Sequence, residues 1–126
     1  MSAGPNPGMD QDTFEQFHEQ LERYVRERLI PAEKDMIEHD KVPEDILSEM
    51  KEMGLFGLTV PEDFGGAGLN ITQYAKVVQT MAYAAPAFRS IFSINVGMFN
   101  SAIKNGGTDA QKAEWWPKIA EGAIAC

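Results

Sequence analysis

Apolar side chains recur at three- and four-residue steps from Asp12 onward, which is the spacing of one face of an α-helix. Either Asp12 or Thr13 can cap the start of this helix. Pro31 lies inside the pattern and removes one backbone donor, so we expect the helix to bend or split there. The apolar stripe consists of Phe14, Phe17, Leu21, Tyr24 or Val25, Leu29, Ala32, Met36 and Ile37.

A second, shorter helix is predicted between Pro43 and Gly54. Pro43 suits a first-turn position and Gly54 suits the stop, because proline fixes a helical φ angle and glycine accepts the left-handed angle of a helix end. The stretch from 54 to 69 that follows, GLFGLTVPEDFGGAGL, is too rich in glycine for a regular helix. It therefore predicts an ordered, turn-rich connector. The buried face of the second helix would consist of Ile46, Leu47, Met50 and Met53.

Two further helices are predicted on either side of Pro86. Asn70 and Gln73 have the spacing of a capping box, so a third helix begins there and stops before Pro86. Residues 86–105 are the most apolar segment of the chain, with apolar side chains around most of the helix circumference. That distribution predicts a central, largely buried helix.

A last helix follows the glycine pair at 106–107. Thr108 and Gln111 form another capping box, and the helix should run through Glu121, with Pro117 inside it and Gly122 after it. The closing residues 123–126 are small, apolar and partly β-branched, as at the start of a strand.

These patterns predict an all-α fold with about five helices. We expect residues 1–11 to form a disordered tail, because their first nine positions are rich in glycine and proline. Residues 12–122 would form one helical domain. Residues 123–126 would then be the truncated first residues of a further, β-type domain.

Composition and charge exclude several classes of function. Apolar residues make up 44% of the chain and charged residues 24%, as in a globular protein, and no apolar run is long enough to cross a bilayer. The net charge of -8 is concentrated in the first half, which argues against nucleic acid and anionic membranes as partners. The single cysteine, Cys126, excludes an internal disulfide. We expect a cytoplasmic protein, or one of an organelle.

Acidic pairs and a glycine-rich loop are the first candidates for chemistry. The loop Pro61–Gly68 lacks the lysine and the spacing of phosphate-binding loops, and Glu62 and Asp63 would repel a phosphate. Paired carboxylates could serve acid–base catalysis, but Glu44 and Asp45 suit the positive end of a helix dipole and Glu62 and Asp63 suit solvation. Capping and solvation are the favoured interpretation of both pairs.

Histidine and tryptophan give no catalytic set either. His18 and His39 fall on charged helix positions that we expect to be exposed, and with one cysteine they make a dedicated metal site improbable. Trp115 and Trp116 could stack on a flat ligand, although at helical spacing at least one of them should belong to the core or an interface. From the residues alone we assign no catalytic, cofactor-binding or metal-binding residue.

The order of two segments narrows the interpretation. ILSEMKEMGLFGLTVPEDFGGAGLN (Ile46–Asn70) resembles a stretch of the acyl-CoA dehydrogenases in which a helix ends in Gly-Leu-Phe-Gly and continues into Pro-Glu-x-Phe/Tyr-Gly-Gly-x-Gly. GGTDAQKAEWWPKIAEG (Gly106–Gly122) is similar to the family's Gly-Thr-x-x-Gln-Lys-x-x-x-x-Pro-x-x-x-x-Gly helix. The resemblance covers about residues 12 to 126, in the expected order.

The resemblance implies the N-terminal helical domain of an FAD-dependent enzyme that dehydrogenates acyl-CoA thioesters across Cα–Cβ. It implies acyl-CoA as substrate, an electron-transferring flavoprotein as acceptor, a homo-oligomer, and a cytoplasmic or mitochondrial matrix location. The family's flavin-binding segment, catalytic base and most CoA contacts have no counterpart in this sequence, so the isolated chain should be inactive and bind no FAD.

The resemblance implies a supporting role for some residues of this chain in the substrate cavity. The family helix that matches Pro86–Asn105 helps to line the acyl end of the cavity. On this chain the candidates are Ser90, Ile91, Ile94, Asn95 and Met98. Each of these residues could equally be an ordinary core contact of a buried helix.

A different class of function stays open. The chain could work by itself as a helical interaction or self-association module, because a domain that normally packs on others leaves apolar area uncovered. Parts of Pro86–Asn105 and the pair Trp115 and Trp116 would then be exposed and would find a partner.

Overall fold

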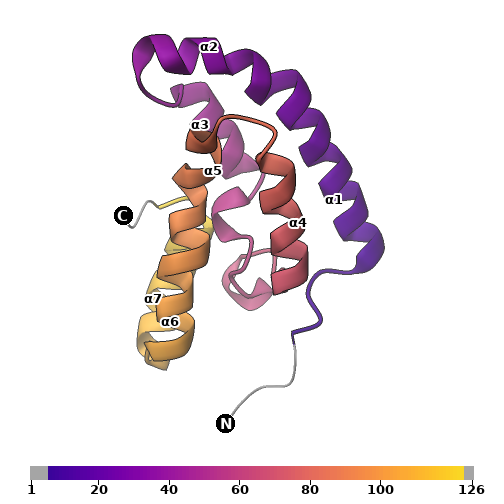
Figure 1. The fold of residues 1–126 in the computed structure, drawn as a ribbon. Coiled ribbons are helices and arrows are strands. Elements are labelled where there is room, and N and C mark those ends of the chain that lie inside the picture. The colour runs from indigo at the N-terminus through magenta and orange to yellow at the C-terminus, as the bar shows by residue number, and fades with distance from the viewer. Residues whose placement is uncertain (1–5, 124–126) are drawn as a thin grey trace.

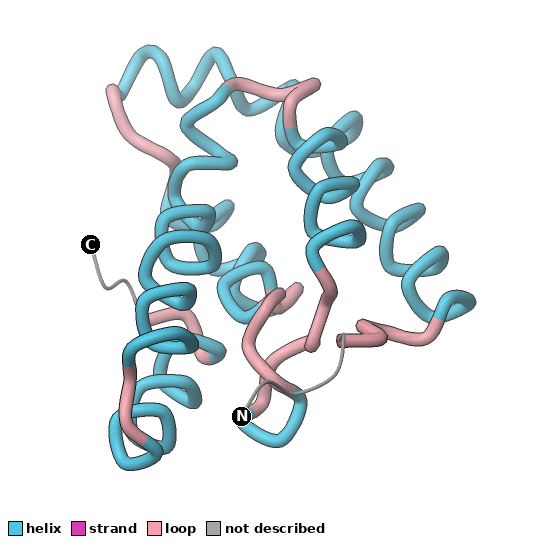
Figure 2. The backbone as a smooth tube through the Cα atoms, turned by 60° about the horizontal axis from the view of Figure 1, so that its bottom comes forward, coloured by secondary structure: helices cyan, strands magenta, loops and turns pink. Residues whose placement is uncertain are grey.

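The computed structural model describes residues 6–123, and within that range the chain forms helices joined by loops, with no strand. The helical elements form five continuous rods, two of which contain a π-helical segment, and Figures 1 and 2 show how these rods are arranged. The all-α class and the number of helices are therefore confirmed. No helix in the described part of the chain has the length and apolar character needed to cross a bilayer. The predicted strand start at 123–126 lies outside the described residues except for Ala123.

The first rod consists of α1 (Gln11–Tyr24), the π-helical segment η1 (Val25–Leu29) and α2 (Ile30–His39). It forms the long edge of the molecule in Figure 1. Pro31 does not split it. Proline has no N–H and its ring crowds the carbonyl four residues back, and the widened turn of η1, in which Ile30 N–H bonds to Val25 O, lies directly before it.

The start of α1 lies earlier than the sequence pattern indicated. Asp10 is the N-cap, and its side chain accepts a hydrogen bond from Thr13 N at 3.2 Å, so the predicted cap at Asp12 or Thr13 is wrong. An aspartate just before the first turn satisfies one of the free backbone N–H groups there. The apolar stripe begins only at Phe14, which is why the pattern alone placed the start too late.

Residues 6–10, which fall inside the predicted disordered tail 1–11, lie against the start of α4. The Gln73 side chain accepts from Met9 N at 3.0 Å and donates to Met9 O at 2.8 Å, and Asn70 Nδ2 donates to Pro7 O at 3.2 Å. These two side chains thus pair with the backbone of the segment as a neighbouring strand would. Residues 1–5 lie outside the described residues.

Helix α3 (Glu44–Glu52) leads into a connector with two 3₁₀ turns, η2 (Leu55–Gly57) and η3 (Glu62–Phe64). The ordered connector that was predicted is confirmed. It lies so close to α7 that a Cβ on Gly57 would stand 2.9 Å from Ala120 Cα. A Cβ on Gly66 would meet Val60 O at 2.1 Å. Glycine is required at both positions because the backbones approach closely.

The remaining rods are α4 (Ile71–Met81), then α5 (Pro86–Ser93), η4 (Ile94–Phe99) and α6 (Asn100–Gly106) in one continuous helix, and finally α7 (Asp109–Ala120). Both predicted capping boxes are present: Asn70 with Gln73, and Thr108 with Gln111. In each box the two side chains satisfy each other's backbone donors.

The apolar interior has two unequal parts. The main core lies between α1, α3, α4 and α5, and its largest fully buried side chains include Phe56, Phe88 and Phe92. A smaller cluster joins the connector to α7 and consists of Val60, Trp116 and Ile119, with Phe64 and Phe99 packed against it. Packing of α7 on the rest of the molecule therefore depends on few side chains.

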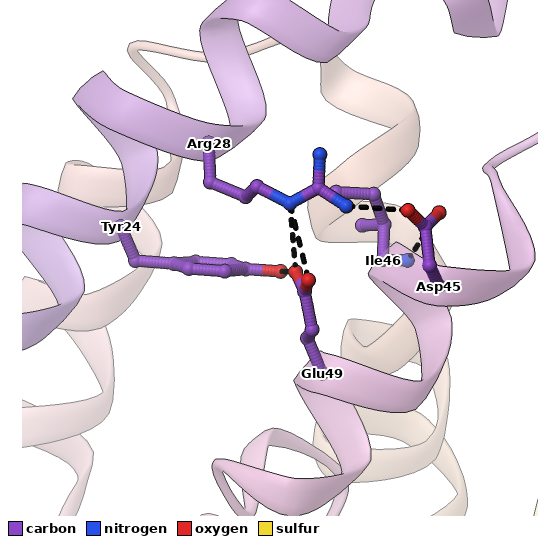
Figure 3. A network of polar contacts seen from close by, with 5 residues as sticks. All are labelled: Tyr24, Arg28, Asp45, Ile46 and Glu49. Atoms are coloured by element: carbon purple, nitrogen blue, oxygen red, sulfur yellow. Dashed lines mark hydrogen bonds and ion pairs between the residues drawn. The ribbon is translucent and has the colours of Figure 1, made fainter.

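Polar side chains join the first rod to α3, as Figure 3 shows. Tyr24 OH donates to Glu49 Oε2 at 2.9 Å, and Arg28 Nε contacts both Glu49 oxygens at 3.1 Å, while its Nη2 contacts Asp45 Oδ2 at 2.5 Å. Burial and the Glu49 hydrogen bond raise the pKa of Tyr24. The hydrogen bond from Arg28 lowers the pKa of Asp45. The cluster is a surface clamp between two helices.

Candidate functional site

The five candidate cavity residues fall on two sides of one helix. Ile94 is 38% exposed and Met98 is 72% exposed, and Ser90 is half-buried at the same four-residue spacing, so these three follow one outward face. Ile91 packs at the edge of the main core. Asn95 is 1% exposed and points inward. The structure thus brings three of the candidates together and separates the other two.

The prediction that residues 86–105 are buried around most of their circumference is wrong. Phe88, Phe92 and Val96 are buried, while the opposite side carries the exposed Ile94 and Met98. The sequence pattern does not separate these two sides, because apolar residues occur on both of them: those on one side pack in the core and those on the other face outward.

A chain of three hydrogen bonds lies beneath this face. Trp116 Nε1 donates to Asn100 Oδ1 at 2.6 Å, and Asn100 Nδ2 donates to Thr59 Oγ1 at 2.7 Å. Thr59 Oγ1 in turn donates to Val96 O at 3.0 Å, within η4. The carbonyls of a π turn lose their usual partners four residues on, so the threonine hydroxyl satisfies one of them.

The sequence analysis missed this chain entirely. Thr59 lies in the connector, Asn100 in α6 and Trp116 in α7, and only folding brings them together. One usable signal was a tryptophan that is expected to be buried, because its indole N–H then needs an acceptor. A second signal was the presence of Asn95 and Asn100 in the most apolar segment of the chain, since buried amides are normally paired.

The two tryptophans have different surroundings. Trp116 is buried and its ring lies 4.9 Å from that of Phe64, which confirms that at least one tryptophan belongs to the core. Trp115 is partly exposed, with Phe99 edge-on at 6.0 Å and Lys118 Nζ 4.9 Å from its centroid. A shallow groove between α6 and α7 lies beside it and is lined by Phe99, Ala102, Ile103, Gly106, Gly107, Gln111 and Trp115.

The two histidines lie far from the candidate face. His18 is half-buried rather than exposed, because its ring stacks on Phe14 and its Nε2 lies 2.6 Å from Thr80 Oγ1. His39 is exposed at the end of α2, with Asp35 and Glu38 close enough to share an ion. Solvated side chains of this kind are ordinary at the end of a helix. His18 does contact the Thr80 hydroxyl, but Thr80 is only 7% exposed, so we interpret this pair as a packing contact between α1 and α4 and assign it no catalytic role.

The acidic pairs have structural roles. Glu44 and Asp45 occupy the first turn of α3, and Glu62 and Asp63 occupy the first turn of η3, all of them exposed. Carboxylates in these places stabilise the positive end of a helix. Asp45 also pairs with Arg28, as described above.

Within residues 6–123 no buried side-chain nitrogen or oxygen lacks a hydrogen-bond partner. The amides and hydroxyls beneath the candidate face are committed to one another and to the backbone. We derive no catalytic step from these residues.

Comparisons with known proteins give a consistent result. Residues 11–123 match the family model described as acyl-CoA dehydrogenase, N-terminal domain. (2S)-methylsuccinyl-CoA dehydrogenase of Cereibacter sphaeroides is 36% identical over 118 residues, which are 93% of this chain and 21% of that protein. The mitochondrial very long-chain specific acyl-CoA dehydrogenase of Rattus norvegicus is 36% identical over 100 residues, which are 79% of this chain and 15% of that protein.

Solved structures share the fold. A chain in a structure of the electron transferring flavoprotein of Acidaminococcus fermentans superimposes with a TM-score of 0.77 at 23% identity, over 92% of this chain and 30% of that one. Butyryl-CoA dehydrogenase from Megasphaera elsdenii gives 0.76 at 20% identity, over 97% of this chain and 31% of that one. The chain thus spans about a third or less of each of these proteins.

Proposed function

The chain belongs to the acyl-CoA dehydrogenase family, and from this premise we propose that it works as the N-terminal helical domain of an FAD-dependent acyl-CoA dehydrogenase. The complete enzyme would remove two hydrogens across Cα–Cβ of a fatty or branched acyl-CoA thioester. Its electron acceptor would be an electron-transferring flavoprotein, and it would assemble as a homo-oligomer in the cytoplasm or, in a eukaryote, in the mitochondrial matrix. This proposal is supported by the relatives, which are acyl-CoA dehydrogenases several times longer than this chain.

The outward face of α5 and η4 is the observation that carries the role of this chain. Ile94 and Met98 form an exposed apolar stripe beside the polar, half-buried Ser90, and Met98 is 72% exposed. Leaving such area in water is unfavourable by about 25 cal/mol per Å². We propose that this stripe lines the acyl end of the substrate cavity, with Ile91 at its edge and Asn95 behind it.

The chemistry itself would come from elsewhere in the enzyme. FAD, when bound, supplies the redox chemistry, and the protein supplies positioning. Since the buried polar groups here are already paired, we propose that the flavin contacts and the base lie in residues outside these 126. The 126-residue chain alone should then show no acyl-CoA dehydrogenation.

An independent module is the second candidate function, favoured by the same exposed stripe. Ile94, Met98 and Trp115 could bind a second copy of the chain instead of an acyl group. Sedimentation of the 126-residue chain tests this directly. A dimer that dissociates in the Met98→Asp variant would support the function of an independent self-association module.

The deciding experiment is intact mass and visible absorption of the protein isolated from its source cells with an antibody against this chain. We expect a chain about three times as long as this one, by analogy with the solved structures, with flavin absorption that acyl-CoA bleaches. A species of 14.0 kDa without flavin bands would overturn the enzyme proposal.

The cavity role has its own test in that enzyme. Met98→Trp should shift the preference toward shorter acyl chains, because the larger side chain fills the end of the cavity. Ile37→Trp is the matched control, since Ile37 is 73% exposed but lies on α2. An equal effect of both variants, or of neither, would contradict the cavity role.

A further inference from the structure

The π-helical segment η4 turns two asparagines to the same side. In a regular α-helix, side chains five residues apart point about 140° away from each other. In η4 the Asn100 N–H donates to Asn95 O, five residues back, so that one residue lies above the other. Asn95 is 1% exposed and Asn100 is 3% exposed. Asn95 follows the buried Phe88 and Phe92 at helical spacing, and the wide turn therefore brings Asn100 to the same buried side.

Each asparagine holds a different part of the C-terminal segment. Asn100 accepts from the Trp116 indole in the middle of α7. Asn95 Nδ2 donates to the carbonyl oxygen of Ala123 at 2.7 Å, past the end of α7. Ala123 N–H also donates to Lys118 O at 3.0 Å, so this residue is held from both its nitrogen and its oxygen.

The bond from Asn95 does more for position than for stability. Ala123 lies at the surface and its hydrogen bond from Asn95 is only partly buried, so water could replace part of that bond. A leucine would fill the volume of Asn95 without the cost of burying an amide. A buried amide committed to an exposed backbone group is explained if the place of that group matters.

We propose that Asn95 is a positioning residue that fixes the path of the chain as it leaves α7, and that the π turn of η4 places Asn100 on the same side, where it holds the middle of α7. This inference rests on the proposed function, because Ile94 and Met98 on the outer side of the same turn are the proposed cavity lining. The turn would thus set the lining face and the outgoing chain at a fixed distance from each other. Asn95 acts through Ala123 and touches no acyl group.

Hydrogen exchange of the 126-residue chain, measured by NMR, tests the proposal. In Asn95→Leu we expect the protection of the Ala123 amide to fall at least tenfold relative to that of Ile119, which lies inside α7. Asn100→Leu is the matched control, because it removes the same group five residues on. It should speed exchange of the Trp116 indole and lower the melting temperature, while the ratio of Ala123 to Ile119 stays unchanged.

A measurement on the unaltered chain covers the case in which Asn95→Leu does not fold. A scalar coupling across the hydrogen bond from Asn95 Nδ2 to the Ala123 carbonyl carbon should be detectable. Its absence would overturn the proposal, as would an Asn95→Leu chain that folds and keeps the Ala123 to Ile119 ratio. None of these readouts involves flavin or acyl-CoA, so the proposed function can fail separately.

Discussion

The two π-helical segments of this molecule have the same backbone geometry and different origins. η1 lies directly before Pro31, a residue that cannot take part in a regular turn. Within η4 there is no proline, and its carbonyl at Val96 is bonded to the Thr59 side chain, from a connector nearly forty residues earlier. η1 also presents the charged Arg28 to partners near the surface, whereas η4 turns neutral amides inward.

The difference shows that a widened turn can be imposed locally or from a distance. A proline acts locally, through its own ring and its missing N–H. A π turn without proline must be stabilised by contacts that the rest of the fold supplies, and such turns are frequent at functional sites. This comparison makes η4 the more sensitive of the two to substitutions elsewhere in the chain.

Asn100→Ala should have the largest effect, because it removes the amide that joins α6, the connector and α7. The buried Trp116 indole and the Thr59 hydroxyl each lose a partner. Unpaired buried groups cost about 1–3 kcal/mol each, so we expect the free energy of unfolding to fall by about 3 kcal/mol. Urea denaturation followed by tryptophan fluorescence measures it. A loss below about 1 kcal/mol would mean that the hydrogen-bond chain does not hold η4.

Thr59→Val should have an intermediate effect. Valine keeps the shape of threonine but leaves Val96 O and Asn100 Nδ2 without their shared partner. Thr59 is half-buried and water can replace part of the loss, so about 1–2 kcal/mol is expected. Hydrogen exchange should rise in η4 and stay constant in η1. Equal changes in both segments would contradict their separate origins.

Pro31→Ala should change geometry more than stability. Alanine gives residue 31 an amide that can bond to Glu27 O, so the turn can close and Ile30 N–H can move from Val25 O to Arg26 O. We expect less than about 1 kcal/mol, because alanine also returns freedom to the unfolded chain. Couplings across the hydrogen bonds distinguish the two patterns. A π turn that persists would show that tertiary contacts hold η1 as well.

Asp45→Asn should have the smallest effect, and one that depends on pH. The pKa of Asp45 is lowered by its hydrogen bond from Arg28, so the charged pair stabilises the fold above the ordinary carboxyl pKa of 3.8. The stability difference between the two chains should be present at pH 7. It should vanish as the pH falls below 3.8 through the lowered pKa. Thermal unfolding over pH 3 to 7 measures it, and a constant difference would contradict the pair.

The fold was predictable where signals are local. Helix ends follow from capping boxes such as Thr108 with Gln111, and the connector follows from its glycines. The N-cap at Asp10 was not predicted, because it lies one turn before the first residue of the apolar stripe and the hydrophobic pattern does not extend to it. Pro31 predicted a bend or a split of the first helix. A helix can also accommodate a proline by widening one turn, and the sequence pattern does not distinguish these outcomes.

The candidate site was predictable only in part, and only through the family resemblance. The resemblance identified the helix that carries Ser90, Ile94 and Met98. The sequence of that helix does not by itself distinguish the side that faces the core from the side that faces outward. Asn95 was nominated with them through the same resemblance, and in the structure it lies on the buried side of the helix with Phe88 and Phe92. The pairing of Asn100 with Trp116 depends on the tertiary fold, which no short-range pattern contains.

The close approach at Gly57 constrains how this sequence can drift through evolution. The atom that a side chain there would meet first is the Cα of Ala120, a backbone atom that every amino acid possesses. No change at position 120 can therefore compensate for a change at 57. A lineage that lost this glycine could keep the fold only by moving α7 outward, away from Val60 and out of reach of Asn100.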